Sequence, residues 1–473
     1  MKVKTQQFTE TAKKELENQK TRALLDMISS IVSARRINAM ASFPDPTAAL
    51  ELGRTIRAEA VARMPELLEQ FEKKATANGA VVFWARDAKE ANEYILRLAE
   101  ERNIKYITKG KSMVTEEIAL NETLVENGIE VFEADLGEFI AQLLKKPPFH
   151  IVGPAINIPV EEICDIFMQK GILTEPKTDP VELGAAARAF LRNKFHHLDM
   201  GITGVNMAVA ETGTIINVEN EGNIRFAKSS PRTQVSVMTI EKVVPTMRDA
   251  VHLLRLLCRN CTAQKLSAYV SMDSGPKKPN EIDGPEEFFI VIVDNGRSEF
   301  YADLQAREAL RCIRCGACMY ECPIYMKIGG YPYGWAYSGP MGQVLNPLLL
   351  GLDKTQDLYN ACTLCNSCKS ICPGGIDHPK MLLSYRAQEA EKASPGGSSS
   401  RSKSRFMRAF AWATKKVWRW NLGIKGARPF INQGAHDGVI EKMPGSFEGW
   451  FKKRNLPAIA RKTFHERMKK KND

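Results

Sequence analysis

Eight cysteines lie in two short runs whose spacing suits the binding of iron and sulfide. The runs are CIRCGACMYECP from Cys312 and CTLCNSCKSICP from Cys362, and both follow the pattern C-x2-C-x2-C-x3-C-P. A loop with three thiolates at this spacing can hold three corners of one [4Fe–4S] cluster, whereas structural zinc usually takes two separated cysteine pairs. Disulfides between such close neighbours would be strained. The proline ends the local turn without needing a backbone N–H.

The fourth cysteine of each run predicts that the two runs share their clusters. In two-cluster proteins this cysteine ligates the cluster of the other run. We therefore expect one cluster on Cys312, Cys315, Cys318 and Cys372 and the other on Cys322, Cys362, Cys365 and Cys368. The long segment that separates the two runs and its helix-like flanks favour an all-α, helical ferredoxin-type domain over a compact β-hairpin ferredoxin. Two neighbouring clusters pass electrons one at a time, so this domain is predicted to carry electrons rather than to catalyse.

Two further segments are candidates for binding an anion. GITGVNMAVAETGTIINVENEGN (201–223) contains Asn206, Glu211 and Thr212, and KGKSM (109–113) contains Lys111. Glycine-rich turns leave backbone N–H groups free to surround an anion. Neither segment is a dinucleotide fingerprint or a P-loop. On the residues alone, ligand binding and plain turn structure are both open for each segment.

The rest of the chain must position these groups, and its sequence pattern divides it into four parts. Residues 1–75 repeat apolar residues at three- and four-residue steps and are predicted to be helical. Residues 76–300 alternate short apolar runs with helical segments, which predicts an α/β domain with a mainly parallel sheet. The runs expected to be strands are 80–85, 105–109, 129–134, 149–154, 213–219, 235–240 and 288–294. Residues 301–393 are helix-like around the cysteines, and residues 394–473 form a basic linker and tail that begins with SPGGSSSRSKS.

The charge distribution argues against a nucleic-acid-binding protein. The net charge is +11, but residues 401–473 hold 19 Lys and Arg against 5 Asp and Glu, a net charge of +14. The rest of the chain therefore sums to about −3, which leaves the body of the protein without a basic footprint. The N-terminus has no apolar signal segment and no apolar run is long enough for a membrane span, so we expect a cytoplasmic protein. The remaining cysteines, Cys164, Cys258 and Cys261, lie in apolar helical contexts and are expected to be buried structural thiols.

The basic tail also contains an amphipathic helical candidate. In RFMRAFAWATKKVWRWNLG an apolar stripe is formed by Phe406, Phe410, Ala413, Val417 and Trp420. Such a stripe among basic residues suits docking on the anionic inner face of a membrane or on a partner. Packing of the stripe back onto its own domain is the alternative.

Several motifs together resemble the iron–sulfur component of the lactate-utilization (LUD) family. They are KSMVTEEIALNETL, DLGEFIAQL, NMAVAETGT, IEKVVPT, DNGRS and AREALRCIRCGAC, in the family's order. The resemblance extends from about residue 50 to 390. The resemblance implies an α/β LUD domain related to NagB, RpiA and CoA-transferases, fused to a helical two-cluster ferredoxin domain. It also implies oxidation of L-lactate to pyruvate in the cytoplasm, shared with a cysteine-rich iron–sulfur subunit and a second LUD subunit.

Four positions where the family usually has histidine differ in this chain. They are Phe83, Asn157 in PAIN, Gln234 in PRTQV and Tyr331 in GYPYG. The changes remove groups that titrate or bind metals near neutral pH but leave the predicted cluster ligands intact. The substrate is accordingly left open between L-lactate and another 2-hydroxy acid.

Three functions are compatible with these patterns. The first is an electron-transfer subunit of a lactate-type dehydrogenase, with Glu211, Asn206, Thr212 and Lys111 as candidate ligand contacts and the primary acceptor on a partner, because no flavin or nicotinamide fingerprint is present. The second is a non-catalytic scaffold and electron relay in another redox complex. The third, by analogy of fold alone, is a transferase that uses Glu211 as its nucleophile, but two electron-carrying clusters have no part in that reaction.

Overall fold

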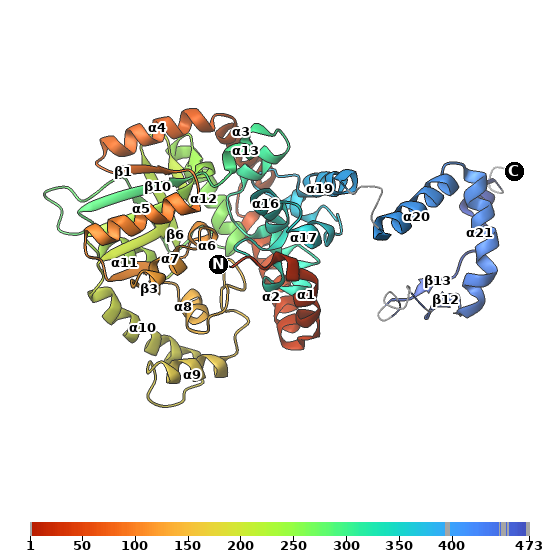
Figure 1. The fold of residues 1–473 in the computed structure, drawn as a ribbon, viewed down its shortest axis with the longest axis horizontal. Coiled ribbons are helices and arrows are strands. Elements are labelled where there is room, and N and C mark those ends of the chain that lie inside the picture. Colours follow the sequence, from red (N-terminus) through yellow and green to blue (C-terminus); the bar gives the residue numbers. More distant parts are fainter. Residues whose placement is uncertain (1, 393–397, 444, 446–450, 452–453, 470–473) are drawn as a thin grey trace. The chain divides into compact units, whose positions relative to one another are not determined.

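In the computed structural model, a six-stranded parallel sheet organises the α/β part of the chain (Figure 1). The strand order is β1-β10-β7-β4-β2-β3, and every pairing is parallel. The strands are β1 (Val81–Ala85), β2 (Tyr106–Lys109), β3 (Glu130–Glu133), β4 (Met200–Gly204), β7 (Thr233–Thr239) and β10 (Glu287–Val293). This sheet confirms the predicted α/β domain.

The sheet buries apolar side chains on both faces. Along the interior strand β10, Phe288, Ile290 and Ile292 belong to one core, and the intervening Phe289, Val291 and Val293 belong to another. The first core is closed by α3 (Pro46–Ala62) and α4 (Met64–Ala77), and the second by α5 (Ala88–Glu101), α6 (Met113–Glu117) and α7 (Leu120–Glu126). Burial on both faces explains why β10 is almost continuously apolar in sequence.

A smaller sheet joins the α/β domain to the cysteines. Its order is β8-β5-β6-β9, made of β8 (Val243–Val244), β5 (Met207–Val209), β6 (Thr214–Glu219) and β9 (Tyr269–Asp273). Helix α12 (Met247–Cys261) packs on it, and the same core contains Ile313, Cys315 and Ala317 from the first cysteine run. The segment 201–223, proposed above as a glycine-rich loop, is therefore largely β4, β5 and β6.

One predicted strand is wrong. Residues 149–154 form an irregular loop in which the Phe149 N–H donates to the carbonyl of Pro154 at 2.8 Å. Phe149 is fully buried against the cysteine segment, and a Cβ added at Gly330 would lie 1.9 Å from its carbonyl oxygen. The apolar run is thus buried between two parts of the chain rather than in a sheet.

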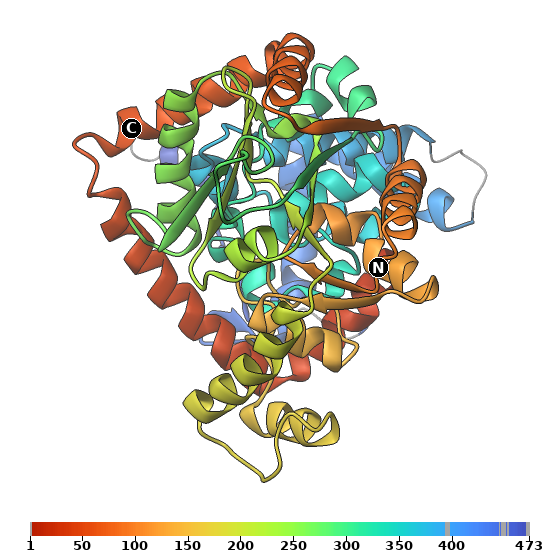
Figure 2. The same ribbon diagram turned by 90° about the vertical axis from the view of Figure 1, so that its left-hand side faces the viewer.

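The cysteine segment is built from short helices, and the N-terminal helices pack against it. Ser29 in α2 (Gln19–Met40) donates to the carbonyl of Tyr320 at 3.2 Å, and Thr5 donates to that of Lys354 at 2.7 Å. Helix α1 (Phe8–Glu17) contacts the same segment. The helices around the cysteines are α14 (Ala317–Tyr320), α15 (Tyr325–Ile328), α16 (Gly339–Leu350), α17 (Gln356–Asn360), α18 (Ser367–Ile371) and α19 (His378–Lys392). Figure 2 shows the same ribbon turned by 90°.

The structure describes residues 2–392, 398–443, 445, 451 and 454–469. Residues 1–387 form one compact unit and residues 388–473 a second. The second unit contains α20 (Ser398–Thr414), α21 (Val417–Ile431), α23 (Phe464–Lys469) and a three-stranded sheet of β11 (Ala435–His436), β12 (Val439–Ile440) and β13 (Leu456–Pro457). Because α20 begins at Ser398, residues 398–404 of the predicted linker are helical, and residues 393–397 lie outside the described part. Among the described helices none is both long and apolar enough to cross a membrane.

Candidate metal centre and adjoining cavity

The eight cysteines of the two runs line two cavities, four to each. One is lined by Cys312, Cys315, Cys318 and Cys372, and the other by Cys322, Cys362, Cys365 and Cys368. Each cavity therefore receives three cysteines from one run and the last cysteine of the other run. The structure brings together the same two groups that the spacing predicts.

The two cysteine loops have the same backbone form. Arg314 and Gly316 have φ of 59° and 72°, and the equivalent Leu364 and Asn366 have φ of 57° and 66°. Such left-handed conformations are uncommon for residues other than glycine. They turn the N–H of Arg314 toward the Cys312 sulfur at 3.4 Å and the N–H of Leu364 toward that of Cys362 at 3.3 Å. Backbone donors of this kind stabilise a thiolate.

Several of these thiols are buried where ionisation is opposed, whereas the pKa of the exposed Cys365 is lowered by hydrogen bonds with Ser367. Burial raises the pKa of Cys372 and of Cys322 to about 11. Burial and the neighbouring Cys322, Cys362 and Cys365 raise that of Cys368 to about 12. Four thiolates in one such cavity require cations between them, which the irons of a cluster supply. The donor set and its surroundings thus fit two [4Fe–4S] clusters.

A third, polar cavity of about 310 Å³ lies at the carboxyl ends of the parallel strands. Its wall includes Lys111 after β2, Asp135 after β3, Asn206 after β4 and Thr239 at the end of β7. Ligands of open parallel sheets bind at this edge. The polar cavity also shares four lining residues with the cavity of Cys312, namely Met113, Ile151, Arg314 and Tyr337.

Of the four ligand contacts predicted from the sequence, the structure brings Lys111 and Asn206 together in this cavity. Glu211 and Thr212 lie in the turn between β5 and β6, at the other end of the hairpin from Asn206. The Glu211 carboxylate accepts the N–H of Met247 at the start of α12, at 2.9 Å, and the Thr212 hydroxyl donates to that of Thr214 at 2.8 Å. Both side chains thus have local structural contacts outside the polar cavity.

Two cations of the polar cavity were not predicted as ligand contacts. Lys242 ends the short 3-10 helix η2 (Ile240–Lys242), and Arg314 lies inside the first cysteine loop. Burial and the nearby Arg314 guanidinium lower the pKa of Lys242 to about 8, so its ammonium is still mostly charged at pH 7. The sequence signal was present as the lysine of IEKVVPT and the arginine between two cysteines. Nothing in the local pattern shows that the two residues meet.

The other three cysteines are placed differently from one another. Cys164 is buried in α9 (Val160–Gln169), where its sulfur accepts the N–H of Lys177 at 3.3 Å. Cys258 and Cys261 belong to α12 and line the polar cavity. Cys258 is buried, and Cys261 is half-buried.

A buried chain of charges runs from Arg314 into the α/β domain. Arg314 Nη2 lies 3.2 Å from Glu241 Oε1, and Arg297 Nε lies 3.1 Å from Glu241 Oε2. Arg297 in turn donates to both carboxylate oxygens of Glu117, at 2.8 and 2.6 Å, and Tyr337 donates its hydroxyl to the same carboxylate. Burial opposes ionisation of Glu241, but the two guanidinium groups outweigh it and hold its pKa at about 2. The network keeps Arg314 in place at the wall between the two cavities.

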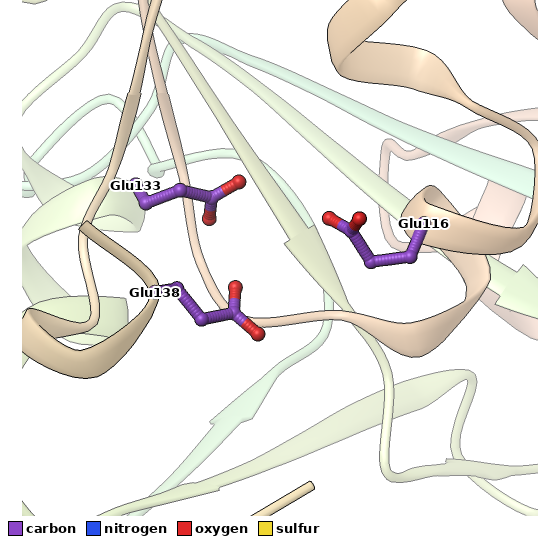
Figure 3. A group of neighbouring side chains, drawn as sticks. All are labelled: Glu116, Glu133 and Glu138. Carbon is purple, nitrogen blue, oxygen red and sulfur yellow. The ribbon is translucent and has the colours of Figure 1, made fainter. Parts of the chain in front are cut away.

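Three carboxylates point toward one another near the end of β3 (Figure 3). Glu116, Glu133 and Glu138 converge, and the fully buried Lys109 ammonium lies 2.9 Å from both Glu116 and Glu133. Burial and the Glu133 charge raise the pKa of Glu138 well above its usual range. Lys109, although part of KGKSM, is therefore bound to acidic side chains, and Lys111 is the lysine of that segment that reaches the polar cavity.

The four positions that differ from the family pattern lie away from the polar cavity. The Phe83 ring stacks on Tyr94 with 3.8 Å between centroids, and Gln234 is fully buried in β7, where it donates to Thr203 at 3.0 Å. Asn157 donates to the Tyr331 hydroxyl at 3.2 Å, so two of the four changes contact each other. The lining of the cavity is thus unaffected by these changes.

Comparisons with known proteins agree with this architecture. Residues 68–293 match the LUD domain, residues 308–376 match a 4Fe-4S dicluster domain, and residues 385–473 match the model described as Lactate utilisation protein B, C-terminal. The fold and the two cysteine cavities define an iron–sulfur protein in which a LUD domain precedes a domain with two [4Fe–4S] clusters.

The relatives identify the family. Lactate utilization protein B of Bacillus pumilus is 39% identical over 472 residues, covering 100% of this chain and 98% of that protein. Lactate utilization protein B of Bacillus subtilis is 38% identical over 468 residues, covering 98% and 96%. The chain belongs to the lactate utilization protein B family. A crystal structure of a DUF162 family protein from Deinococcus radiodurans is 15% identical and matches 49% of this chain and 98% of that one, with a TM-score of 0.29.

Proposed function

We propose that the chain is the iron–sulfur electron-transfer component of a complex that oxidises L-lactate, or a related 2-hydroxy acid, to the 2-oxo acid. The observation that carries the proposal is the wall shared by the polar cavity and the cavity of Cys312. A small acid bound in the polar cavity would lie beside a cluster. The family membership and the two-cluster domain support the same function.

The proposed ligand sets follow the two cysteine cavities. Cluster 1 is held by Cys312, Cys315, Cys318 and Cys372, and cluster 2 by Cys322, Cys362, Cys365 and Cys368. When bound, the clusters supply one-electron transfer.

The proposal retains Lys111 and Asn206 as contacts of the acid, because both line the polar cavity. It leaves Glu211 and Thr212 as parts of the β5–β6 turn. A transferase with Glu211 as nucleophile is correspondingly disfavoured, since this carboxylate is bonded to the start of α12.

The oxidation also needs partners. Converting a 2-hydroxy acid to a 2-oxo acid releases two electrons and two protons, and the chain contains no flavin or nicotinamide fingerprint. We propose that a cysteine-rich iron–sulfur subunit and a second LUD subunit complete the complex in the cytoplasm. The relation of the LUD domain to NagB, RpiA and CoA-transferases and the ferredoxin-type fold of the cluster domain belong to the same proposal.

Iron analysis and EPR of anaerobically purified protein test this function. We expect about eight iron and eight sulfide per chain and two interacting [4Fe–4S] signals after reduction by dithionite. If L-lactate reduces the clusters of the chain alone, the chain is itself catalytic. If L-lactate reduces them only when the partner subunits are present, the chain is the electron-transfer component. Zinc, or about four iron, would contradict the two-cluster reading. If both clusters are present but no 2-hydroxy acid reduces them in the assembled complex, the alternative function is favoured, namely a scaffold and electron relay in another redox complex.

We further propose that the second unit contacts the anionic inner face of the membrane. Helices α20 and α21 expose Trp412, Trp418 and Phe430 by 60%, 59% and 79%, and the Arg419 guanidinium lies 4.4 Å from the centre of the Trp412 ring. Of the predicted stripe, Phe410 and Trp420 pack edge to face, and the side chain of Phe406 lies outside the described part. Exposed aromatic rings among basic residues are typical of helices that lie in a lipid interface.

The expected result is binding of the full-length protein to vesicles that contain phosphatidylglycerol, weakened by salt. Replacing Trp412 and Trp418 together by alanine should weaken sedimentation with these vesicles by about tenfold, whereas Trp84→Ala, at a 40% exposed position of β1, should not. Equal binding to neutral vesicles would contradict the preference for an anionic surface. No binding to vesicles, or no effect of the double change, would contradict the membrane proposal and favour a protein partner.

A further inference from the structure

Arg314 is placed between the polar cavity and the proposed cluster 1. Its side chain lines both cavities and is 11% exposed. One of its terminal nitrogens, Nη2, lies 3.2 Å from Glu241, and the other, Nη1, is buried without a hydrogen-bond partner. A buried donor left without an acceptor costs free energy, especially on a charged group. The Arg314 guanidinium therefore keeps one donor without a protein partner at this wall.

Lys242 is a second cation on the wall of the polar cavity. Among the described residues, no hydrogen bond or ion pair to its ammonium is found. The acidic side chains of the same wall accept hydrogen bonds from backbone N–H groups. Asp135 accepts the N–H of Glu138 at the start of α8 (Leu136–Leu143) at 3.0 Å, Glu219 accepts two N–H groups at the start of α11 (Asn223–Ser229), at 2.7 and 3.0 Å, and Glu221 accepts the N–H of Asn220 at 3.3 Å.

We propose that the polar cavity binds the carboxylate of a small 2-hydroxy or 2-oxo acid between the Arg314 guanidinium and the Lys242 ammonium. Through Arg314, which also lines the cavity of Cys312, this binding lowers the reduction potential of cluster 1. The inference rests on the proposed function, because it names the part of the site that holds the acid. Arginine with a second cation is a common way of binding a carboxylate. Asn206, Lys111 and Thr239 then surround the rest of the molecule.

The coupling follows from charge. A reduced cluster carries one more negative charge than an oxidised one, and the Arg314 cation in the Cys312–Cys315 loop stabilises it. An anion that binds this guanidinium cancels part of that stabilisation, so it should bind the oxidised protein more tightly and make cluster 1 harder to reduce. By thermodynamic reciprocity the two effects are equal in free energy.

The second cluster provides an internal control. Its loop has Leu364 at the position of Arg314, in the same left-handed conformation. The cavity of cluster 2 shares no lining residue with the polar cavity. The ligand should therefore shift the potential of cluster 1 and leave that of cluster 2 almost unchanged.

The test is a redox titration of the full-length holoprotein, followed by EPR, with and without saturating oxamate. Oxamate has the shape of pyruvate and is not reduced under these conditions. We expect about tenfold weaker binding to the reduced protein, which is a fall of about 59 mV for the one-electron couple of cluster 1. Calorimetry on the oxidised protein measures the affinity itself. Sulfate at the same concentration should give neither heat nor shift.

Three variants complete the test. Arg314→Leu, which copies the residue of the second loop, should abolish the oxamate-dependent shift, and Lys242→Met should weaken oxamate binding by at least tenfold. Arg311→Leu removes an equal charge next to Cys312 without touching the polar cavity, so it should change the resting potential but keep the shift.

The outcomes separate this inference from the proposed function. Binding with no shift, a shift that survives Arg314→Leu, or an equal response to sulfate would overturn the inference while the clusters and the proposed function stand. The absence of two clusters in the same samples would overturn both.

Discussion

Replacing Cys312 and Cys372 together by alanine is expected to remove no more iron than replacing either of them alone. Both line the same cavity, although they belong to different cysteine runs of the chain. If they ligate one cluster, the first substitution already removes that cluster, and the second has nothing left to remove. Each single variant and the double variant should therefore keep about four of about eight iron per chain. Iron and sulfide analysis with EPR checks this directly.

Replacing one cysteine from each cavity is expected to remove more iron than either single change. Cys312→Ala combined with Cys368→Ala affects both cavities and should leave almost no cluster. Cys164→Ala, at a buried thiol far from either run in sequence, should keep both clusters. The cluster that survives in each single variant also reports that the protein has folded, since ligation and folding are coupled.

One pair of cysteines decides between crossed and uncrossed ligation. Cys312 and Cys322 belong to the same run but line different cavities. Replacing both by alanine should remove both clusters. Retention of about four iron in that double variant would mean that each run holds its own cluster, and the crossed assignment would be abandoned.

The sequence was most informative where the chemistry is encoded over a few residues. The cysteine spacing predicts the two clusters because three of the four proposed ligands of each lie within a single loop. The strands β1, β2, β3, β7 and β10 were also predicted, since buried parallel strands appear as short, nearly continuous apolar runs. Residues 149–154 have the same appearance, but Phe149 packs on Gly329 and Gly330 of the cysteine segment. Local pattern cannot tell these two kinds of burial apart.

The polar cavity could be predicted only in part, because it is assembled from distant segments. Lys111 and Asn206 were recognisable as polar residues after strands. Arg314 and Lys242 are far apart in the sequence and meet only because the first cysteine loop packs on the core of the smaller sheet and α12. Glu211 was attractive in sequence for its glycine-rich surroundings, yet the short β5–β6 hairpin carries it to the other end. Tertiary packing, rather than residue type, decides which side chains share the site.

Replacing Arg297 by methionine is expected to be the most destabilising change outside the cysteines. Its guanidinium is fully buried and lies between Glu117 and Glu241, whose side chains are 0% and 1% exposed. Methionine fills similar space but leaves both carboxylates without their main counter-charge. Removing one partner from a buried ion pair costs about 3–5 kcal/mol, because the remaining charge is left in a poorly solvated place. Urea unfolding of the anaerobic holoprotein at pH 7 should show a loss of this size.

A matched pair near the surface separates the effect of burial from that of pairing. Arg102 also binds a carboxylate with two nitrogens, at 2.8 and 2.9 Å from Glu287, but the two side chains are 24% and 34% exposed. Water and counter-ions screen that interaction, so Arg102→Met should cost less than about 1 kcal/mol. If Arg297→Met also costs less than about 1 kcal/mol, the Arg297 network contributes little to stability.

The origin of the lost stability can be tested by removing a carboxylate charge that Arg297→Met leaves unpaired. Adding Glu117→Gln to the variant neutralises one of the two carboxylates while keeping its shape. The amide can still accept the Asn295 donor, now 2.6 Å from Glu117 Oε1. If the cost of Arg297→Met is electrostatic, the double variant should regain more than about 1 kcal/mol, because an unpaired buried charge is replaced by a neutral polar group. A double variant no more stable than Arg297→Met would place the loss in packing around α13 (Arg297–Ala302) instead. The same result would argue against a role for the Arg297–Glu241–Arg314 ion pairs in holding Arg314 at the wall of the polar cavity.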